Sequence, residues 1–144
     1  MTKRKKKVLI ICTGNSCRSQ MAEGWVRHDL GDRVEVHSAG TTPYIVHPLA
    51  IQVMGEAGVD ISGHRSKSIL EFQHEKFDLV ITVCDSARQI CPSFPGAVKQ
   101  VHESIADPFQ FGGSGDIAIR KFRESRDLIR DKIESLIIKE LELD

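Results

Sequence analysis

The cysteines and one arginine of this chain have types and spacings that point to chemistry. Cys12 and Arg18 are separated by five residues, and Cys84 and Cys91 lie far downstream. In a chain without secretory features, cysteines are normally kept as free thiols, so they raise the question of metal binding or redox chemistry. Cys12 and Cys17, like Cys84 and Cys91, are too far apart for the short loop of a zinc site, so we expect no metal.

The segment Cys12-Thr13-Gly14-Asn15-Ser16-Cys17-Arg18-Ser19 is suited to hold a tetrahedral oxyanion. A loop between a strand and a helix points its backbone N–H groups inward, and the positive helix terminus adds to their attraction for an anion. The Arg18 guanidinium would contact two oxyanion oxygens, and the same field would keep Cys12 as a nucleophilic thiolate that accepts a hydrogen bond from Ser19. Without a strand before the loop and a helix after it, Cys12 would instead be interpreted as a small buried side chain that ends a strand.

Strands and helices alternate along the chain and supply that context. The apolar run Val8–Ile11 ends at Cys12 and predicts a strand buried on both faces, and the apolar residues from Met21 to Leu30 recur at helical spacing. Further strands are expected at 34–36, 77–83 and 98–101, and further helices at 49–57 and 116–141. The last helix has Ser114 as its expected cap, and its apolar residues lie on one stripe: Phe122, Ile129, Ile133 and Leu136. The pattern predicts an α/β fold, a doubly wound four-stranded parallel sheet flanked by helices, with Cys12 and Cys84 at carboxyl ends of strands.

Length and charge restrict the remaining possibilities. The chain has 144 residues, 40% of them hydrophobic, which suits one domain, expected at 7–144 after a solvated basic tail at 1–6. Twenty basic and 20 acidic residues give no net charge, so neither nucleic acid nor a membrane is expected as a partner. No apolar segment is long enough to span a bilayer, and no signal-peptide core follows the basic residues, so we expect a cytoplasmic protein.

The stretch from Cys12 to Gly24 resembles the signature of thioredoxin-coupled arsenate reductases and is similar to that of low-molecular-weight protein tyrosine phosphatases. The likeness continues through His37-Ser38-Ala39-Gly40, Val46-His47-Pro48, 58–62 and 77–84, and so covers nearly the whole chain after the tail. It implies a low-molecular-weight tyrosine-phosphatase-like fold.

The oxyanion loop is common to both families, so the other cysteines must separate them. A reductase has to supply two electrons, which in thiol chemistry means forming a disulfide. The resemblance implies that Cys12 attacks arsenate and that Cys84 and Cys91 then act in series as a disulfide relay, with thioredoxin as the reductant and no cofactor. The alternatives are a tyrosine phosphatase acting through a Cys12 phosphocysteine, and a non-enzymatic thiol protein that binds arsenite or soft metals, against which Arg18 argues.

The resemblance also implies roles for residues outside the cysteines. Asp107, before Pro108, would be the general acid, whereas Phe109 and Phe111 are closer to the rim of a phosphatase pocket. Cys17 is expected to pack under the loop. The polar residues expected to hold the loop are Asn15, Ser19, Ser38 and His64. Lys67 stands where some reductases that bind potassium carry an acidic residue, with Asn15, Glu23 and Ser38 at the other ligand positions, so we expect its ammonium in place of the cation.

Overall fold

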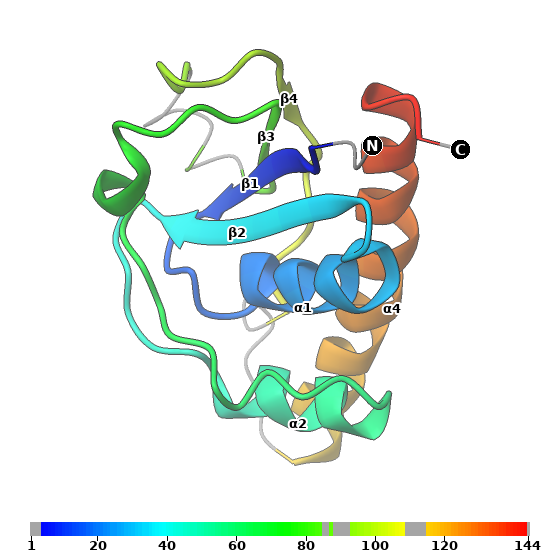
Figure 1. The fold of residues 1–144 in the computed structure, drawn as a ribbon. Coiled ribbons are helices and arrows are strands. Elements are labelled where there is room, and N and C mark those ends of the chain that lie inside the picture. Colours follow the sequence, from blue (N-terminus) through cyan, green and yellow to red (C-terminus); the bar gives the residue numbers. More distant parts are fainter. Residues whose placement is uncertain (1–3, 85–86, 88–92, 109–114, 144) are drawn as a thin grey trace.

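The computed structural model describes residues 4–84, 87, 93–108 and 115–143 (Figure 1). Cys91, Phe109, Phe111 and Ser114 lie outside these ranges. The described strands form one sheet in the order β2-β1-β3-β4, in which every neighbouring pair is parallel. The strands are β1 (Lys6–Cys12), β2 (Val34–Gly40), β3 (Leu79–Thr82) and β4 (Gln100–His102). The predicted four-stranded parallel sheet is confirmed.

Strand β1 occupies the centre of the sheet and carries the candidate nucleophile at its end. It pairs with β2 on one side and with β3 on the other, so that Ile10 lies opposite both Ser38 and Ile81. Residues 8–11 are fully buried, which explains why their apolar run is continuous and does not alternate. The parallel register brings Cys12 beside Gly40, at the carboxyl edge where sheets of this kind bind ligands.

In the described ranges, three helices and one short 3-10 turn accompany the sheet. They are α1 (Arg18–Leu30), α2 (Pro48–Glu56), η1 (Ile69–Phe72) and α4 (Asp116–Glu140). Helix α1 packs against β1, β2 and the long helix α4, and α2 packs against α4 (Figure 1). In the part of the chain described, no helix is long and apolar enough to cross a membrane.

The structure differs from the expected elements mainly at their ends. Strand β2 runs on to Gly40 because it pairs with the whole of β1, whereas β3 is shorter than 77–83 and Phe77 forms only an isolated bridge with Ala97. Residue 115 is a glycine at the N-cap of α4, so the predicted cap at Ser114 is wrong. The apolar stripe of α4 buries Phe122, Ile129, Ile133 and Ile137, while Leu136 is only partly buried.

Candidate active site

Residues 12–18 form a loop between the end of β1 and the first turn of α1. A second segment, residues 41–47, runs along its outer side. The carbonyl oxygens of Cys12, Thr13, Gly14 and Ser16 accept hydrogen bonds from the backbone N–H groups of Thr41, Thr42, Tyr44 and His47, at 3.2, 2.8, 3.0 and 3.0 Å. In a trans peptide the N–H points away from the C=O of the same plane, so the N–H groups that follow these carbonyls face the other side of the loop. That side is a cradle of donors at a helix N-terminus, suited to an oxyanion.

Arg18 closes one side of the cradle. Its Nη1 donates to the carbonyl oxygen of Ile105 at 3.0 Å, and its Nη2 lies 3.8 Å from Asp107 Oδ2. Its buried Nε donates to no described residue, although an unused buried donor is costly. This free donor supports the predicted role of Arg18 as the anion clamp, and the contact with Asp107 brings the predicted general acid to the same cleft.

Cys12 is buried, and its sulfur lies 2.8 Å from the Ser19 hydroxyl. Ser19 Oγ accepts a hydrogen bond from Asn15 Nδ2 at 2.8 Å, which leaves its own hydrogen free to donate to the sulfur. A donor at this position stabilises a thiolate. Cys17 differs, because burial and then the charges of Asp107 and Cys12 raise the pKa of its thiol to about 12. Its side chain is therefore a buried thiol, in agreement with a packing role.

Asn15 has a left-handed backbone conformation, with φ of 47°, and its side chain holds the loop in shape. Such a conformation costs about 1 kcal/mol or more for a residue with a side chain and must be held from outside. The Asn15 amide makes four side-chain hydrogen bonds: it donates to Ser19 and Ser38, and it accepts from Gln20 Nε2 and the Lys67 backbone N–H. The predicted support residues Asn15, Ser19 and Ser38 therefore meet directly.

Two further residues, Gln20 and Gly40, also hold the loop. Both belong to the motifs quoted above, but neither was predicted to have this role. Gln20 is fully buried and donates to both oxygens of Asn15. Gly40 ends β2 against the loop, and a Cβ there would lie 2.5 Å from the carbonyl oxygen of Thr13 and 2.8 Å from Asn15 N. In the sequence, Gln20 is visible only as an amide among apolar helix residues, and Gly40 only as a glycine after a predicted strand. The importance of both depends on long-range contacts, which the sequence does not show.

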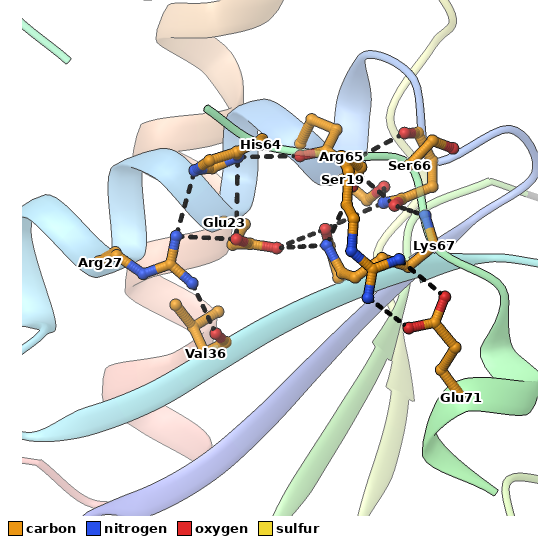
Figure 2. A network of polar contacts seen from close by, with 12 residues as sticks. Ser19, Glu23, Arg27, Val36, His64, Arg65, Ser66, Lys67 and Glu71 are labelled. Carbon is orange, nitrogen blue, oxygen red and sulfur yellow. Dashed lines mark hydrogen bonds and ion pairs between the residues drawn. The ribbon is translucent and has the colours of Figure 1, made fainter. Parts of the chain in front are cut away.

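A buried carboxylate, Glu23, lies behind the loop (Figure 2). Burial alone would raise the pKa of Glu23, but the hydrogen bond from Ser38 and the charges of Lys67, Arg27 and His64 lower it, so Glu23 is ionised at neutral pH. Lys67 Nζ lies 3.5 Å from Glu23 Oε1 and donates to the Arg65 carbonyl at 3.2 Å. The expected contact of the Lys67 ammonium is thus present for Glu23, and its replacement of a cation stays a prediction.

The second thiol, Cys84, is buried just beyond β3. Its sulfur lies 3.2 Å from Thr13 Oγ1 and accepts a hydrogen bond from the Ala87 backbone N–H at 3.4 Å. Thr13 belongs to the oxyanion loop, so Cys84 contacts the loop that ends in the candidate nucleophile. The structure thus places Cys84 against the oxyanion loop, which the sequence had left open, whereas Cys91 lies outside the described residues and its position stays a prediction.

The cradle opens into a cleft of about 490 Å³. Its outer wall is largely apolar and includes Tyr44, Ile45 and Pro48, of which Tyr44 and Ile45 are also exposed to solvent. His47 lines the same wall; burial lowers its pKa against the opposing charge of Asp107, and its Nδ1 accepts from the Leu49 backbone N–H. Among the described residues, no group of three or more histidine, cysteine or acidic side chains is placed to hold a metal ion.

Comparison with known proteins agrees with this geometry. Residues 7–144 match the family described as low molecular weight phosphotyrosine protein phosphatase. An arsenate reductase of Halalkalibacterium halodurans is 42% identical over 131 residues, covering 91% of this chain and 94% of that protein. An arsenate reductase of Staphylococcus epidermidis is 44% identical, covering 91% of this chain and 95% of its own.

Solved structures extend the likeness to three dimensions. An arsenate reductase in its phosphate-binding state superposes with a TM-score of 0.77 at 35% identity, covering 93% of this chain and 98% of the other. A thioredoxin-dependent arsenate reductase of Corynebacterium glutamicum gives a TM-score of 0.65 at 29% identity, covering 96% of this chain and 65% of that longer chain. With its sequence matched from residue 7 to the end, this chain belongs to the low molecular weight phosphotyrosine protein phosphatase family.

Proposed function

We propose that the chain reduces arsenate to arsenite, with Cys12 as the nucleophile and Cys84 as the second thiol. The observation that carries this proposal is the contact between Cys84 and Thr13, because a hydrolytic phosphatase has no use for a second thiol against its oxyanion loop. The relatives named as arsenate reductases, which align over nine-tenths of this chain, support the choice of substrate.

In the first step, arsenate binds in the cradle and the Cys12 thiolate attacks arsenic. A sulfur–arsenic bond forms, and one arsenate oxygen departs as water with a proton from Asp107, which lies across the cleft beside Arg18. Arg18 and the inward N–H groups stabilise the negative charge on the remaining oxygens.

In the second step, the Cys84 thiolate attacks the Cys12 sulfur. The sulfur–arsenic bond breaks and leaves its electron pair on arsenic, which is reduced from the pentavalent to the trivalent state and leaves as arsenite. Cys91 then attacks Cys84 in the Cys12–Cys84 disulfide and frees Cys12. The Cys84–Cys91 disulfide requires an external dithiol, for which thioredoxin is the proposed partner because one structural neighbour is a thioredoxin-dependent enzyme.

Phosphatase activity is a second candidate, favoured by the size of the cleft. An arsenate ion fills only part of about 490 Å³, a volume in the range of small-molecule pockets, and the apolar wall would accept an aryl group. The same Cys12 and Arg18 would then form and hydrolyse a phosphocysteine.

Single-turnover assays of three variants test the proposal. Cys12→Ser should abolish both arsenate reduction and hydrolysis of an aryl phosphate, because a hydroxyl is a far weaker nucleophile than a thiolate. Cys84→Ser should release little arsenite and keep any aryl phosphate hydrolysis, which serves as an internal control for folding. Cys91→Ser should release about one arsenite per chain and stop as a Cys12–Cys84 disulfide.

Mass mapping of the disulfides identifies the stalled species in each case. The relay is wrong if Cys84→Ser still reduces arsenate or if Cys91→Ser cycles normally with thioredoxin. A wild-type chain that hydrolyses aryl phosphate and leaves arsenate unreduced would point to the phosphatase.

A further inference from the structure

The Ser66 hydroxyl lies between the oxyanion loop and the segment that runs along its outer side. Ser66 Oγ accepts a hydrogen bond from the Tyr44 backbone N–H at 3.0 Å, and it lies 2.9 Å from the carbonyl oxygen of Gly14. Because a backbone N–H can only donate and a carbonyl can only accept, the hydrogen of this hydroxyl must point at Gly14. One oxygen atom therefore joins three segments of the chain, 12–18, 41–47 and 64–67.

The carbonyl oxygen of Gly14 accepts two hydrogen bonds, because the Tyr44 backbone N–H also donates to it at 3.0 Å. Both donors lie outside the loop and hold the carbonyl on that side. In a trans peptide the N–H of Asn15 then points the opposite way, into the cradle. The peptide between Gly14 and Asn15 is thus one of the inward donors, and its orientation is set by contacts outside the loop.

A second orientation of this peptide would relieve backbone strain. Asn15 has a φ of 47°, which a residue with a side chain rarely adopts. Rotating the peptide plane by about half a turn, as between a type II and a type I turn, changes ψ of Gly14 and φ of Asn15 together and returns Asn15 to a negative φ. The flanking Cα atoms stay in place, so the side-chain contacts of Asn15 do not oppose the rotation. The flipped carbonyl of Gly14 would point into the cradle and repel an oxyanion.

We propose that Ser66 is a positioning residue that holds the Gly14–Asn15 peptide in the orientation that binds an oxyanion. It acts on the outer side of the loop, whereas the inner side is held through Gln20, whose Oε1 lies 2.9 Å from His64 Nδ1. Without the Ser66 hydroxyl, one of the two donors to the Gly14 carbonyl is lost and the flipped peptide becomes populated. The apparent affinity for the anion then falls in proportion to the competent fraction. The proposal rests on the oxyanion loop as the site of arsenate binding.

The backbone next to Ser66 is fixed well enough to hold the hydroxyl in place. The N–H of the adjacent residue, Lys67, donates to Asn15 Oδ1 at 2.8 Å, and its carbonyl oxygen accepts from the Gly40 backbone N–H at 2.8 Å (Figure 2). A serine side chain is short and has a single rotatable bond before its oxygen, so little entropy is lost when the hydroxyl binds Gly14. The contact is therefore available before any anion arrives.

The test measures the binding of inorganic phosphate to the reduced full chain by titration calorimetry. Ser66→Ala should weaken binding about two- to tenfold, the range expected for one lost hydrogen bond. Ser66→Thr keeps the hydroxyl and should bind as wild type does, whereas Ser66→Val has the shape of threonine without the hydroxyl and should behave as Ser66→Ala. Nuclear magnetic resonance relaxation dispersion should detect microsecond-to-millisecond exchange at the Asn15 amide in Ser66→Ala, and saturating phosphate should remove it.

Ser68→Ala is the matched control for damage to the fold. The Ser68 hydroxyl caps η1 by accepting from the Leu70 backbone N–H at 3.1 Å, so its loss should lower the melting temperature and leave phosphate affinity and the Asn15 amide as in wild type. Wild-type affinity in Ser66→Ala, equal affinities of Ser66→Thr and Ser66→Val, or an Asn15 amide without exchange in Ser66→Ala would each overturn the proposal. Because the exchange measurement needs no anion, a wild-type chain that neither binds phosphate nor reduces arsenate would count against the proposed function alone.

Discussion

A single residue in this site can contribute with its backbone and with its side chain. Thr13 is the clearest case: its peptide N–H follows the outward carbonyl of Cys12 and faces the cradle, while its hydroxyl contacts Cys84. One residue thus links the part of the loop that binds the anion to the thiol that would resolve the adduct. Gly40 contributes by having no side chain at all.

Gly40→Ala tests that contribution. A Cβ 2.5 Å from the Thr13 carbonyl oxygen must push the loop or β2 aside, so we expect a loss of about 1–3 kcal/mol in the free energy of unfolding and weaker anion binding. Gly55→Ala in α2 is the matched control, because nothing lies within 4 Å of its Cβ position and alanine favours the helix. Equal denaturation midpoints for the two variants would show that the close approach at Gly40 has no effect.

At the scale of elements, the segment between α2 and η1 supplies a positive charge to the back of the oxyanion loop. Lys67 lies on this segment, and its nearly buried ammonium meets the Glu23 carboxylate of α1. An ammonium fixed beside that carboxylate would repel a monovalent cation from the same oxygens. The backbone N–H of Lys67 also holds Asn15, so the segment binds the loop through two contacts.

We therefore predict that arsenate turnover does not depend on potassium. Initial rates measured in potassium chloride and in sodium chloride at equal ionic strength should agree. Using one anion throughout keeps anion competition for the cradle constant. Rates that rise sharply with potassium but not with sodium would contradict an ammonium in that place.

Helices α1 and α4 meet at a pair of carboxyl groups, Asp29 and Glu134. Burial, the hydrogen bond with Asp29 and its charge raise the pKa of Glu134 to about 8. Burial would raise the pKa of Asp29 as well, but hydrogen bonds from Glu134, His28 and Arg130 lower it to about 2. At neutral pH the pair is thus held by one proton on Glu134, donated to the Asp29 carboxylate.

The raised pKa gives the sign of a pH effect on stability. The proton on Glu134 stabilises the fold fully below the ordinary pKa of 4.5, and its contribution is lost as pH rises through about 8. Glu134→Gln keeps a donor to Asp29 at every pH, so the melting temperature of the variant relative to wild type should increase between pH 5 and pH 9. A constant difference over that range, measured by thermal unfolding, would rule out the shared proton.

At the scale of the whole molecule, the described part of the site combines segments that are far apart in the sequence: 12–19, 40–47, 64–67, Cys84 and 105–107. Because this arrangement exists only in the folded chain, an oxyanion that binds it should stabilise the fold. Phosphate at one hundred times its dissociation constant should add about 2.7 kcal/mol and raise the melting temperature.

Arg18→Lys should lose most of this increase, because a point charge cannot replace the planar guanidinium. Arg120→Lys makes the same change at an exposed position outside the cleft lining and should respond to phosphate as wild type does. An equal phosphate effect in Arg18→Lys and wild type would show that Arg18 does not clamp the anion.

The sequence by itself determined the features that depend on neighbouring residues. The continuous apolar run before Cys12, the small residues up to Arg18 and the helical spacing after them define a strand, a loop and a helix whose order leaves little choice of geometry. The alternation of such units along the chain specified a parallel sheet, because a parallel connection needs a crossover. The strand ends were less certain, since pairing with β1 extended β2 beyond its own apolar pattern.

Only the tertiary structure decided which distant residues complete the loop. Gln20 and His64 are 44 residues apart, and Thr13 and Cys84 are 71 apart, so no local pattern connects them. Their contacts depend on how segment 64–67 returns to α1 and on β3 pairing beside β1. These contacts also decide the direction of each hydrogen bond. A buried amide or imidazole is oriented by the donors and acceptors that face it in the folded chain, and its place in the sequence does not reveal them.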